Sequence, residues 1–357
     1  MFYRGGKIQV EEKIKMFQDV FAPKSGEKVL FLVDIPHDDI KDNKKWYERR
    51  EMAKDWYQIF NDIGNKIGFL VNWMEYKATG FHNAPIPEEV IEAVHHSNLV
   101  LAITEYSASS SIVPICRMED STTRCASMPG LEKRMENTAF RADYQDVKKY
   151  ALAIEKLLNK ATGAEVSFST GHTLYIDLRN RIAHADTGDC TKYGQAINFP
   201  SGEACKAPYE GTSDEIETFG KSKTEGIWPV KYNKELVKLI IKNNKIVKIV
   251  GDGKKADEMR AFFEENDSRK NIAELGIGCN PKAIVTGNVL EDEKVGGLHI
   301  AYGLSTHIGG KANSDIHQDI CYPKGSPIEA TRLTLINADN TKTEIIRDSK
   351  LRYELLK

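Results

Sequence analysis

The stretch KVLFLVD at residues 28–34 decides the fold class of the first half of the chain. An uninterrupted apolar run of strand length is typical of a parallel strand that helices cover on both faces. A segment with apolar residues at helical spacing follows at about 44–63, and the apolar runs IGFLVNWM and NLVLAITEY follow at 67–74 and 98–106. Strands that alternate with helices in this way predict an open parallel sheet.

The second half of the chain changes in pattern after an amphipathic helix that we expect at about 143–160. The segments VSFST, TLYIDLR, KYGQAINF and IWPVKY are typical of strands separated by turns, and ELVKLIIKNNKIVKIVGD predicts a hairpin. We therefore predict an α/β protein of two domains. We expect residues 1–160 to form an open parallel-sheet, Rossmann-like domain, and residues 161–357 to form a strand-rich, mixed α+β domain.

The balance of charge excludes two classes of partner. The 357 residues include 50 basic and 52 acidic side chains, and the formal net charge is −2. This gives neither the basic surface of a nucleic-acid-binding protein nor a polybasic membrane surface. No run approaches the roughly 20 apolar residues of a membrane span, and the N-terminal sequence has no apolar signal core. We therefore expect a cytoplasmic protein without nucleic-acid or membrane partners.

Two common chemistries lack their sequence signals. The turn after the first apolar run is DIPHDD, and the chain has no GxGxxG there and no GxxxxGK[ST] phosphate loop. A Rossmann-like sheet is then a scaffold and not a sign of a dinucleotide or ATP. The six cysteines form no CxxC pair, which is typical of reduced thiols in a chain of this length.

Acidic residues and histidines in the glycine-rich segments of the second half are the candidates for chemistry. His317 and Asp319 are two positions apart, so on a strand their side chains point to the same face. His299 lies in GGLHIAYG, Glu274 in AELGIGCNP, and Glu203 in NFPSGEACKAP. Each taken alone also fits a structural role, as a hydrogen-bonded pair, a core histidine or a turn acid. Taken together, they form a mixed nitrogen and oxygen donor set that suits a pair of divalent cations.

Three segments resemble the aminopeptidase T family of metallopeptidases, the thermophilic metalloprotease type of leucyl aminopeptidase. They are NFPSGEACKAP, ELGIGCNPKAIVTGNVLEDEKVGGLHIAYG and GGKANSDIHQD, and they cover about residues 198–320 in this order. The resemblance implies a two-domain α/β protein that forms a cytoplasmic homodimer. It also implies a dinuclear site for zinc, cobalt or manganese, and the release of N-terminal residues from peptides.

The same resemblance assigns roles to particular residues. Glu293, in the DEK segment before the first histidine, matches an acid that is either a further ligand or a general base. The positions that match the metal ligands of the family are Glu203, Glu274, His299, His317 and Asp319. One position departs from the family, because Thr306 stands where a tyrosine is expected, with His307 beside it and Tyr302 four residues earlier.

Two enzymatic hypotheses follow from these assignments. The first is a metalloaminopeptidase in which a metal-activated water attacks the peptide and Glu293 or a neighbouring acid moves the proton. The presence of both Glu203 and Glu274 favours it, since a two-metal site needs the extra anionic ligands.

The second hypothesis starts from a similarity to the 2,5-dihydroxypyridine dioxygenases, which use the same scaffold with one ferrous ion to open an aromatic ring. Here His299, His317 and Asp319 form a triad of two histidines and one carboxylate around Fe(II). The acid or base then comes from His172, His184 or His307. A small-molecule substrate replaces the peptide. Hydrolysis of a non-peptide amide or lactam, and a protein that only binds a ligand, complete the alternatives.

Overall fold

The computed structural model describes residues 8–357, which form two compact units. The first unit contains the described residues up to Lys148 together with Asp186–Ser201 and Lys282–Ile284. The second unit contains Lys149–Ala185, Gly202–Pro281 and Val285–Lys357. The chain therefore passes from one unit to the other more than once.

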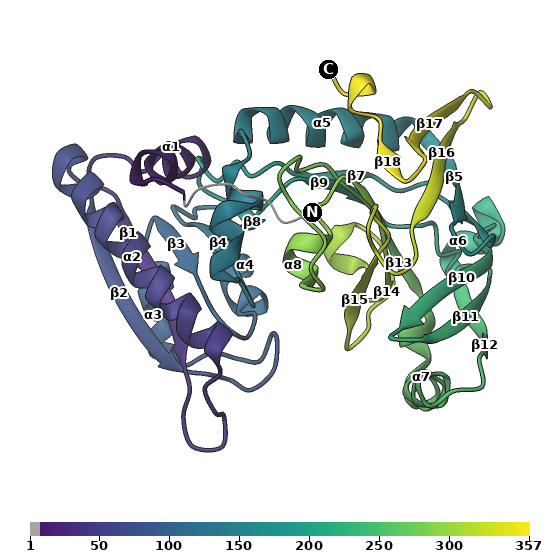
Figure 1. Cartoon of the computed structure of the whole chain (residues 1–357), viewed down its shortest axis with the longest axis horizontal. Helices are drawn as coiled ribbons and strands as arrows, with labels where there is room; N and C mark the ends of the chain where they lie inside the picture. The colour runs from purple at the N-terminus through teal and green to yellow at the C-terminus, as the bar shows by residue number, and fades with distance from the viewer. Residues whose placement is uncertain (1–7) are drawn as a thin grey trace. The chain divides into compact units, whose positions relative to one another are not determined.

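A five-stranded sheet forms the first unit, in the order β2-β1-β3-β4-β8 (Figure 1). Each strand pairs in parallel with its neighbours, as the alternating pattern predicts. Its strands are β1 (Lys28–Ile35), β2 (Leu70–Lys77), β3 (Leu99–Ala102), β4 (Arg124–Ser127) and β8 (Ala196–Asn198). Its helices are α1 (Val10–Val20), α2 (Lys44–Ile67), α3 (Glu88–His95) and α4 (Ser109–Cys116), with the 3-10 helices η1 (Lys133–Asn137) and η2 (Ala139–Arg141).

The apolar run in β1 is buried on both faces, which explains why it does not alternate with polar residues. On one face, the ring of Phe31 packs edge-on against Tyr57 and Phe60 of α2. On the other face, Leu30 and Leu32 belong to a cluster with side chains of α3 and α4. Helices therefore cover the two faces of this sheet, as expected for a parallel sheet.

Asp34 occupies the carboxyl end of β1, where many α/β proteins bind a ligand. It is fully buried and accepts hydrogen bonds from the backbone N–H groups of Glu105 and Tyr106 and from the indole of Trp46. Burial raises the pKa of Asp34 in spite of these bonds. Its oxygens serve the structure of the first unit, which agrees with the missing dinucleotide signal in the sequence.

The second unit contains two sheets. Eight strands follow the order β12-β11-β10-β6-β5-β16-β17-β18, and five follow the order β15-β14-β13-β9-β7. The first sheet contains β5 (Ala161–Phe168), β6 (Thr173–Asp177), β10 (Glu225–Tyr232), β11 (Glu235–Lys242), β12 (Lys245–Val250), β16 (Ala330–Asn337), β17 (Lys342–Arg347) and β18 (Lys350–Leu351). The second contains β7 (Ala183–Asp186), β9 (Glu203–Lys206), β13 (Ile272–Gly278), β14 (Gly297–Gly303) and β15 (His317–Cys321).

Four α-helices and three 3-10 helices accompany these sheets. They are α5 (Tyr144–Lys160), α6 (Ser213–Phe219), α7 (Lys254–Glu265) and α8 (Val289–Asp292), with η3 (Asp267–Lys270), η4 (Thr306–Ile308) and η5 (Tyr353–Leu355). A large apolar cluster joins side chains from both sheets, from α5 and from α7. The α/β class, with a parallel sheet followed by a mixed α+β part, is thereby confirmed.

The domain boundary expected after residue 160 falls at the end of α5, whereas the two compact units divide within that helix, between Lys148 and Lys149. The segment KYGQAINF, predicted as a strand, contains β8, which pairs with β4 in the first unit. The chain thus returns to the first unit at β8. This return depends on contacts between residues far apart in the sequence, so no local pattern predicts it.

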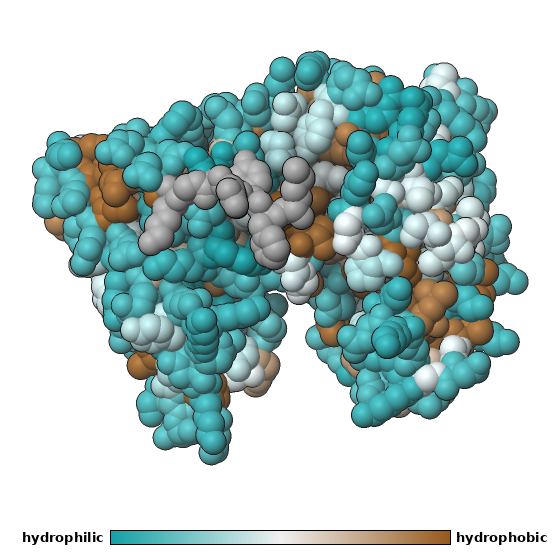
Figure 2. All heavy atoms as spheres, viewed as in Figure 1, coloured by the Kyte–Doolittle hydropathy of each residue, from teal (hydrophilic) through white to brown (hydrophobic). Residues whose placement is uncertain are grey.

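The face of the molecule that Figure 2 shows is mainly hydrophilic over the described residues. Large apolar side chains that are exposed, such as Leu70, Phe81 and Ile182, come from separate segments of the chain. Among the helices of residues 8–357, none has both the length and the apolar character needed to span a bilayer.

Candidate metal centre

Four neighbouring strands, β9, β13, β14 and β15, bring the predicted metal-binding residues to one face of a sheet. Neighbours among them are antiparallel, with Gly276 opposite His299 and Ala301 opposite Asp319. Residues that face each other in such a pair, and every second residue along a strand, share a face. The predicted ligands on this shared face are Glu203, Glu274, His299, His317 and Asp319.

The other positions on this face hold small residues. They are Cys205, Gly276, Gly278, Gly297, Ala301, Gly303 and Cys321. A Cβ atom on Gly276 would lie 1.9 Å from Nε2 of His299, so the imidazole occupies the space of that missing side chain. A Cβ atom on Gly278 would lie 2.3 Å from the carbonyl oxygens of Glu293 and Val295. The segment that follows α8 can therefore lie directly against the strand.

The side chains of the cluster contact one another closely. Nε2 of His299 is 3.1 Å from Oε1 of Glu274 and 3.1 Å from Oε2 of Glu203. Nε2 of His317 is 3.3 Å from Oε2 of Glu274 and 3.5 Å from Oδ2 of Asp319. The structure thus brings together all five residues that the sequence analysis assigned as ligands. That they bind a metal stays a prediction.

The cluster fits a divalent cation. Within residues 8–357, Oδ1 of Asp319 is buried without a hydrogen-bond partner, although such atoms are normally satisfied. The ring nitrogen Nδ1 of His317 lies 2.7 Å from the carbonyl oxygen of Leu304 and donates to it, which leaves Nε2 as the lone-pair donor toward the cluster. Imidazole nitrogens and carboxylate oxygens are the usual donors for Zn²⁺, Mn²⁺ and Fe²⁺.

Lys294 is a member of the cluster that the sequence analysis missed. Its side chain is fully buried, and its ammonium group contacts Oε1 of Glu203 and, at 2.8 Å, Oε1 of Glu293. A buried ammonium needs such carboxylate partners. The signal for it was a single lysine that directly follows three acidic residues, at 291–293, and precedes a glycine-rich apolar strand.

The charges of the cluster shift the pKa values of its members. Burial alone would raise the pKa of Glu274, but hydrogen bonds from His299 and His317 hold it well below its usual range. Burial would lower the pKa values of the two histidines, and their carboxylate partners instead raise them well above the usual range. Without a metal, imidazolium–carboxylate pairs hold the cluster together, and a cation that binds there displaces protons.

Glu293 is shifted in the opposite direction from Glu274. Burial raises its pKa to about 8, and the nearby charges of Glu203 and Asp319 add to the shift while Lys294 opposes it. Its carboxyl group therefore holds a proton at neutral pH. This property suits the acid–base role that the resemblance implied, which stays a prediction.

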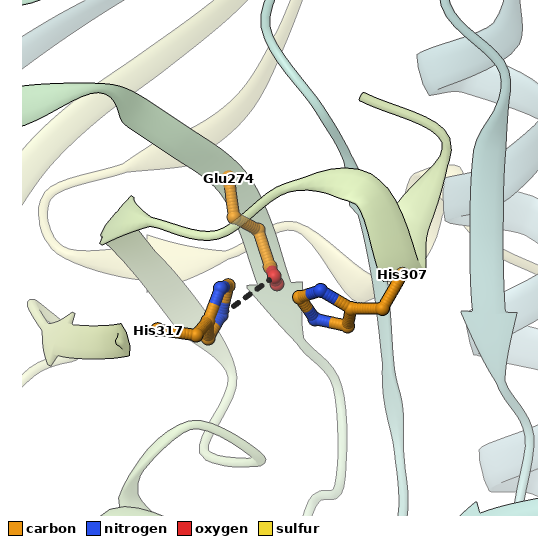
Figure 3. A group of neighbouring side chains, drawn as sticks. All are labelled: Glu274, His307 and His317. Atoms are coloured by element: carbon orange, nitrogen blue, oxygen red, sulfur yellow. Dashed lines mark ion pairs between the residues drawn. The ribbon is translucent and has the colours of Figure 1, made fainter. Parts of the chain in front are cut away.

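The donor atoms divide into two groups that share Glu274. The inner group consists of Glu203, Glu274 and His299, and the outer group consists of Glu274, His307 and His317. Within each group the donor atoms lie within 4.8 Å of one another. Figure 3 shows the outer group, in which the three side chains come from β13, η4 and β15 and point toward one another.

The other residues weighed in the sequence analysis have different surroundings. Tyr302 is buried, and its ring packs edge-on against Trp228 and Phe263, so it does not replace the missing tyrosine. His172 is paired with Thr170 in the turn between β5 and β6. His184 lies on β7 with an exposed side chain, and its Nε2 lies 3.3 Å from the place that a Cβ atom on Gly309, the residue that ends η4, would take.

Comparisons with known proteins favour one of the two families. The family model described as 2,5-dihydroxypyridine 5,6-dioxygenase (NicX) matches residues 72–325, which is more than half of the chain and includes the whole cluster. No curated protein matches the sequence significantly. The family match therefore falls on the dioxygenases, which the sequence analysis held as its alternative.

Two solved structures share the fold. The 2,5-dihydroxypyridine dioxygenase from Pseudomonas putida KT2440 superposes with a TM-score of 0.70 at 17% identity, covering 98% of this chain and 100% of that chain. Wild-type AmpT from Thermus thermophilus gives a TM-score of 0.60 at 14% identity, covering 96% of this chain and 99% of that chain. Identities this low show a common fold and carry no information on activity.

A first prediction concerns Gly276. The change Gly276→Ala places a Cβ atom where the imidazole of His299 lies, so the ring must move out of the cluster. We expect Mn²⁺ or Zn²⁺ to bind roughly 10-fold more weakly or worse, as measured by isothermal titration calorimetry.

The control is Gly130→Ala in the first unit, where the backbone has φ of +67° and no atom lies within 4 Å of the added carbon. It costs about 1 kcal/mol of stability and leaves the metal affinity unchanged. Unchanged affinity in Gly276→Ala would contradict the packing described above.

A second prediction concerns pH. Because burial raises the pKa of Glu293 from 4.5 to about 8, the folded protein keeps a proton between these values that the unfolded chain has released. The stability linked to this proton is complete below pH 4.5 and is lost as the pH rises through 8. For the metal-free protein, Glu293→Gln removes this loss. Its free energy of unfolding relative to wild type should grow by about 1 kcal/mol per pH unit between pH 5.5 and 7.5, measured by urea unfolding.

The control for the pH experiment is Glu264→Gln, which changes an exposed glutamate on α7. Its stability should follow that of the wild type at each pH. A constant difference between Glu293→Gln and wild type over this range would mean that Glu293 is ionised in the folded protein.

Proposed function

The chain belongs to the 2,5-dihydroxypyridine 5,6-dioxygenase family, and we propose that it is a mononuclear Fe(II) dioxygenase that opens a hydroxylated aromatic ring. The family match, which extends over the complete metal cluster, carries this proposal. The substrate class is a small, planar, dihydroxylated ring of the pyridine type. A homodimer and a cytoplasmic location, expected from the sequence, stay predictions.

The charges of the cluster support one ion per chain. Lys294 neutralises Glu203 through a direct contact, and Glu293 is protonated at neutral pH. Glu274 and Asp319 then carry the remaining negative charge, which matches a single divalent cation. Fixed buried charges are stable only when they are balanced in this way.

The residues that hold the ion in this proposal are Glu274, His299, His317 and Asp319. When bound, a ferrous ion supplies the one-electron chemistry that the reaction of O₂ with an organic ring requires. The hydrogen bond from His317 to the carbonyl of Leu304 fixes the orientation of its ring. Glu293 holds a proton on its carboxyl group at neutral pH and is the group that exchanges it with the hydroxyl oxygens of the substrate.

A metalloaminopeptidase is the second candidate function. The specific observation in its favour is the presence of two donor groups that share Glu274, because a shared carboxylate can bridge two ions. The fold of AmpT is similar, but at 14% identity this similarity extends to the fold alone. The two candidates differ in the number of ions, in the metal and in the need for O₂.

The number and identity of the ions test the proposal. Protein purified without chelator and without oxygen should contain one iron per chain by elemental analysis. With 2,5-dihydroxypyridine as the probe, it should consume O₂ in equal amount to the ring that is opened. His317→Ala and Asp319→Ala should lose the iron and at least about 100-fold of the O₂ uptake, since each removes a donor.

The matched control is His95→Ala, an exposed histidine at the end of α3 in the first unit, which should keep both iron and activity. Two zinc, cobalt or manganese ions per chain, with hydrolysis of leucine p-nitroanilide and no O₂ uptake, would instead establish the aminopeptidase.

A further inference from the structure

We propose that His307 is a further ligand of the metal ion, and that the ion lies in the outer group, between Glu274, His307 and His317. The inference rests on the proposed function only for the presence of a divalent ion. It places His307, in place of His299, among the residues that surround that ion. The sequence analysis noted His307 beside the position of the missing tyrosine and considered it as an acid or base, but did not assign it as a ligand.

The carboxylate of Glu274 faces two histidines with different oxygens. Its Oε1 lies near Nε2 of His299, and its Oε2 lies near Nε2 of His317. The side chain therefore separates two positions in which a cation has an oxygen donor. One of these is the inner group, and the other is the outer group.

A cation is already present beside the inner group. The fully buried ammonium of Lys294 contacts Glu203, which is the second carboxylate of that group. A divalent ion among Glu203, Glu274 and His299 would be close to this ammonium in a site without solvent, where like charges repel strongly. The ammonium of Lys294 thus balances negative charge of the inner group without a metal ion.

Within residues 8–357, the ion pairs of Glu274 and His317 join them to each other, to His299 and to Asp319, and none of these pairs involves a lysine or an arginine. The donors of the outer group are two imidazoles and one carboxylate, the set that ferrous ions and related divalent metals prefer when coordination positions must stay open. The rings of His307 and His317 lie edge-on, with centroids 4.6 Å apart and an angle of 90° between their planes. Figure 3 shows His307 reaching toward Glu274 from the side opposite His317.

The local backbone presents His307 to the cluster from the surface. The residue lies in η4, which ends at Gly309 with φ of +83°, a conformation that favours glycine. Its side chain is exposed, whereas His299 is 1% exposed. An ion in the outer group is therefore reached from solvent through the side on which His307 lies, and a substrate approaches it there.

Cobalt provides a test that does not depend on activity. The full-length chain, freed of metal with a chelator, is titrated with Co²⁺, and the visible absorption reports its coordination. The wild type should bind one Co²⁺ per chain. His307→Ala should bind it roughly 10-fold more weakly or worse and should alter the spectrum, while His307→Asp, which supplies another donor, should restore the stoichiometry with a different spectrum.

The control variant is His95→Ala, whose affinity and spectrum should equal those of the wild type. Equal affinity and spectrum in His307→Ala would overturn the inference and leave the proposed metal function intact. Two Co²⁺ per wild-type chain, one of which is lost in His307→Ala, would support His307 as a ligand and overturn the single ion. A wild-type chain that binds no Co²⁺ would overturn both.

Discussion

Negative charge buried on one face of a sheet is the constraint on which the second unit depends. Glu203, Glu274 and Asp319 extend from β9, β13 and β15 into the same space, and none of these carboxylates is exposed to solvent by more than a small fraction. Each would cost several kcal/mol to bury without a counter-charge. The ammonium of Lys294 supplies part of that charge. The rest comes from the protonated imidazoles of His299 and His317 in the metal-free protein, and from a divalent ion when one binds and displaces their protons.

The small residues of the same face follow from this constraint. Five polar side chains and a cation need room, and every second position that does not hold a donor is therefore glycine, alanine or cysteine. At Gly276 the relation is direct, because the ring of His299 fills the volume of the missing side chain. At Gly278 the missing side chain admits the segment that carries Glu293 and Lys294. The glycine-rich character of these segments is a property of the site as well as of the turns.

Parts of this arrangement could be predicted from sequence because they depend on local geometry. The apolar run in β1 indicated a covered parallel strand, and the spacing of His317 and Asp319 indicated a shared face. The register of β9, β13 and β14 could not be predicted in the same way, since it joins residues far apart in the chain. Their glycine-rich contexts made Glu203 and Glu274 candidates, and the resemblance, not periodicity, assigned them as ligands. The sequence did not predict the buried ion pair of Lys294 or the position of His307 beside Glu274, because both depend on which carboxylates the fold brings next to these residues.

The number of ions on such a face is then a matter of charge balance and not of the number of donors. The cluster offers enough donors for two positions, and Glu274 faces both. The ammonium of Lys294, held by the carboxylate of Glu203 and the carboxyl group of Glu293, reduces the negative charge without taking up a metal, so it favours a single ion even when the oxygen donors of a second one are all present. Charge balance is thus the ground on which we propose a single ion for a donor set that resembles that of a dinuclear peptidase.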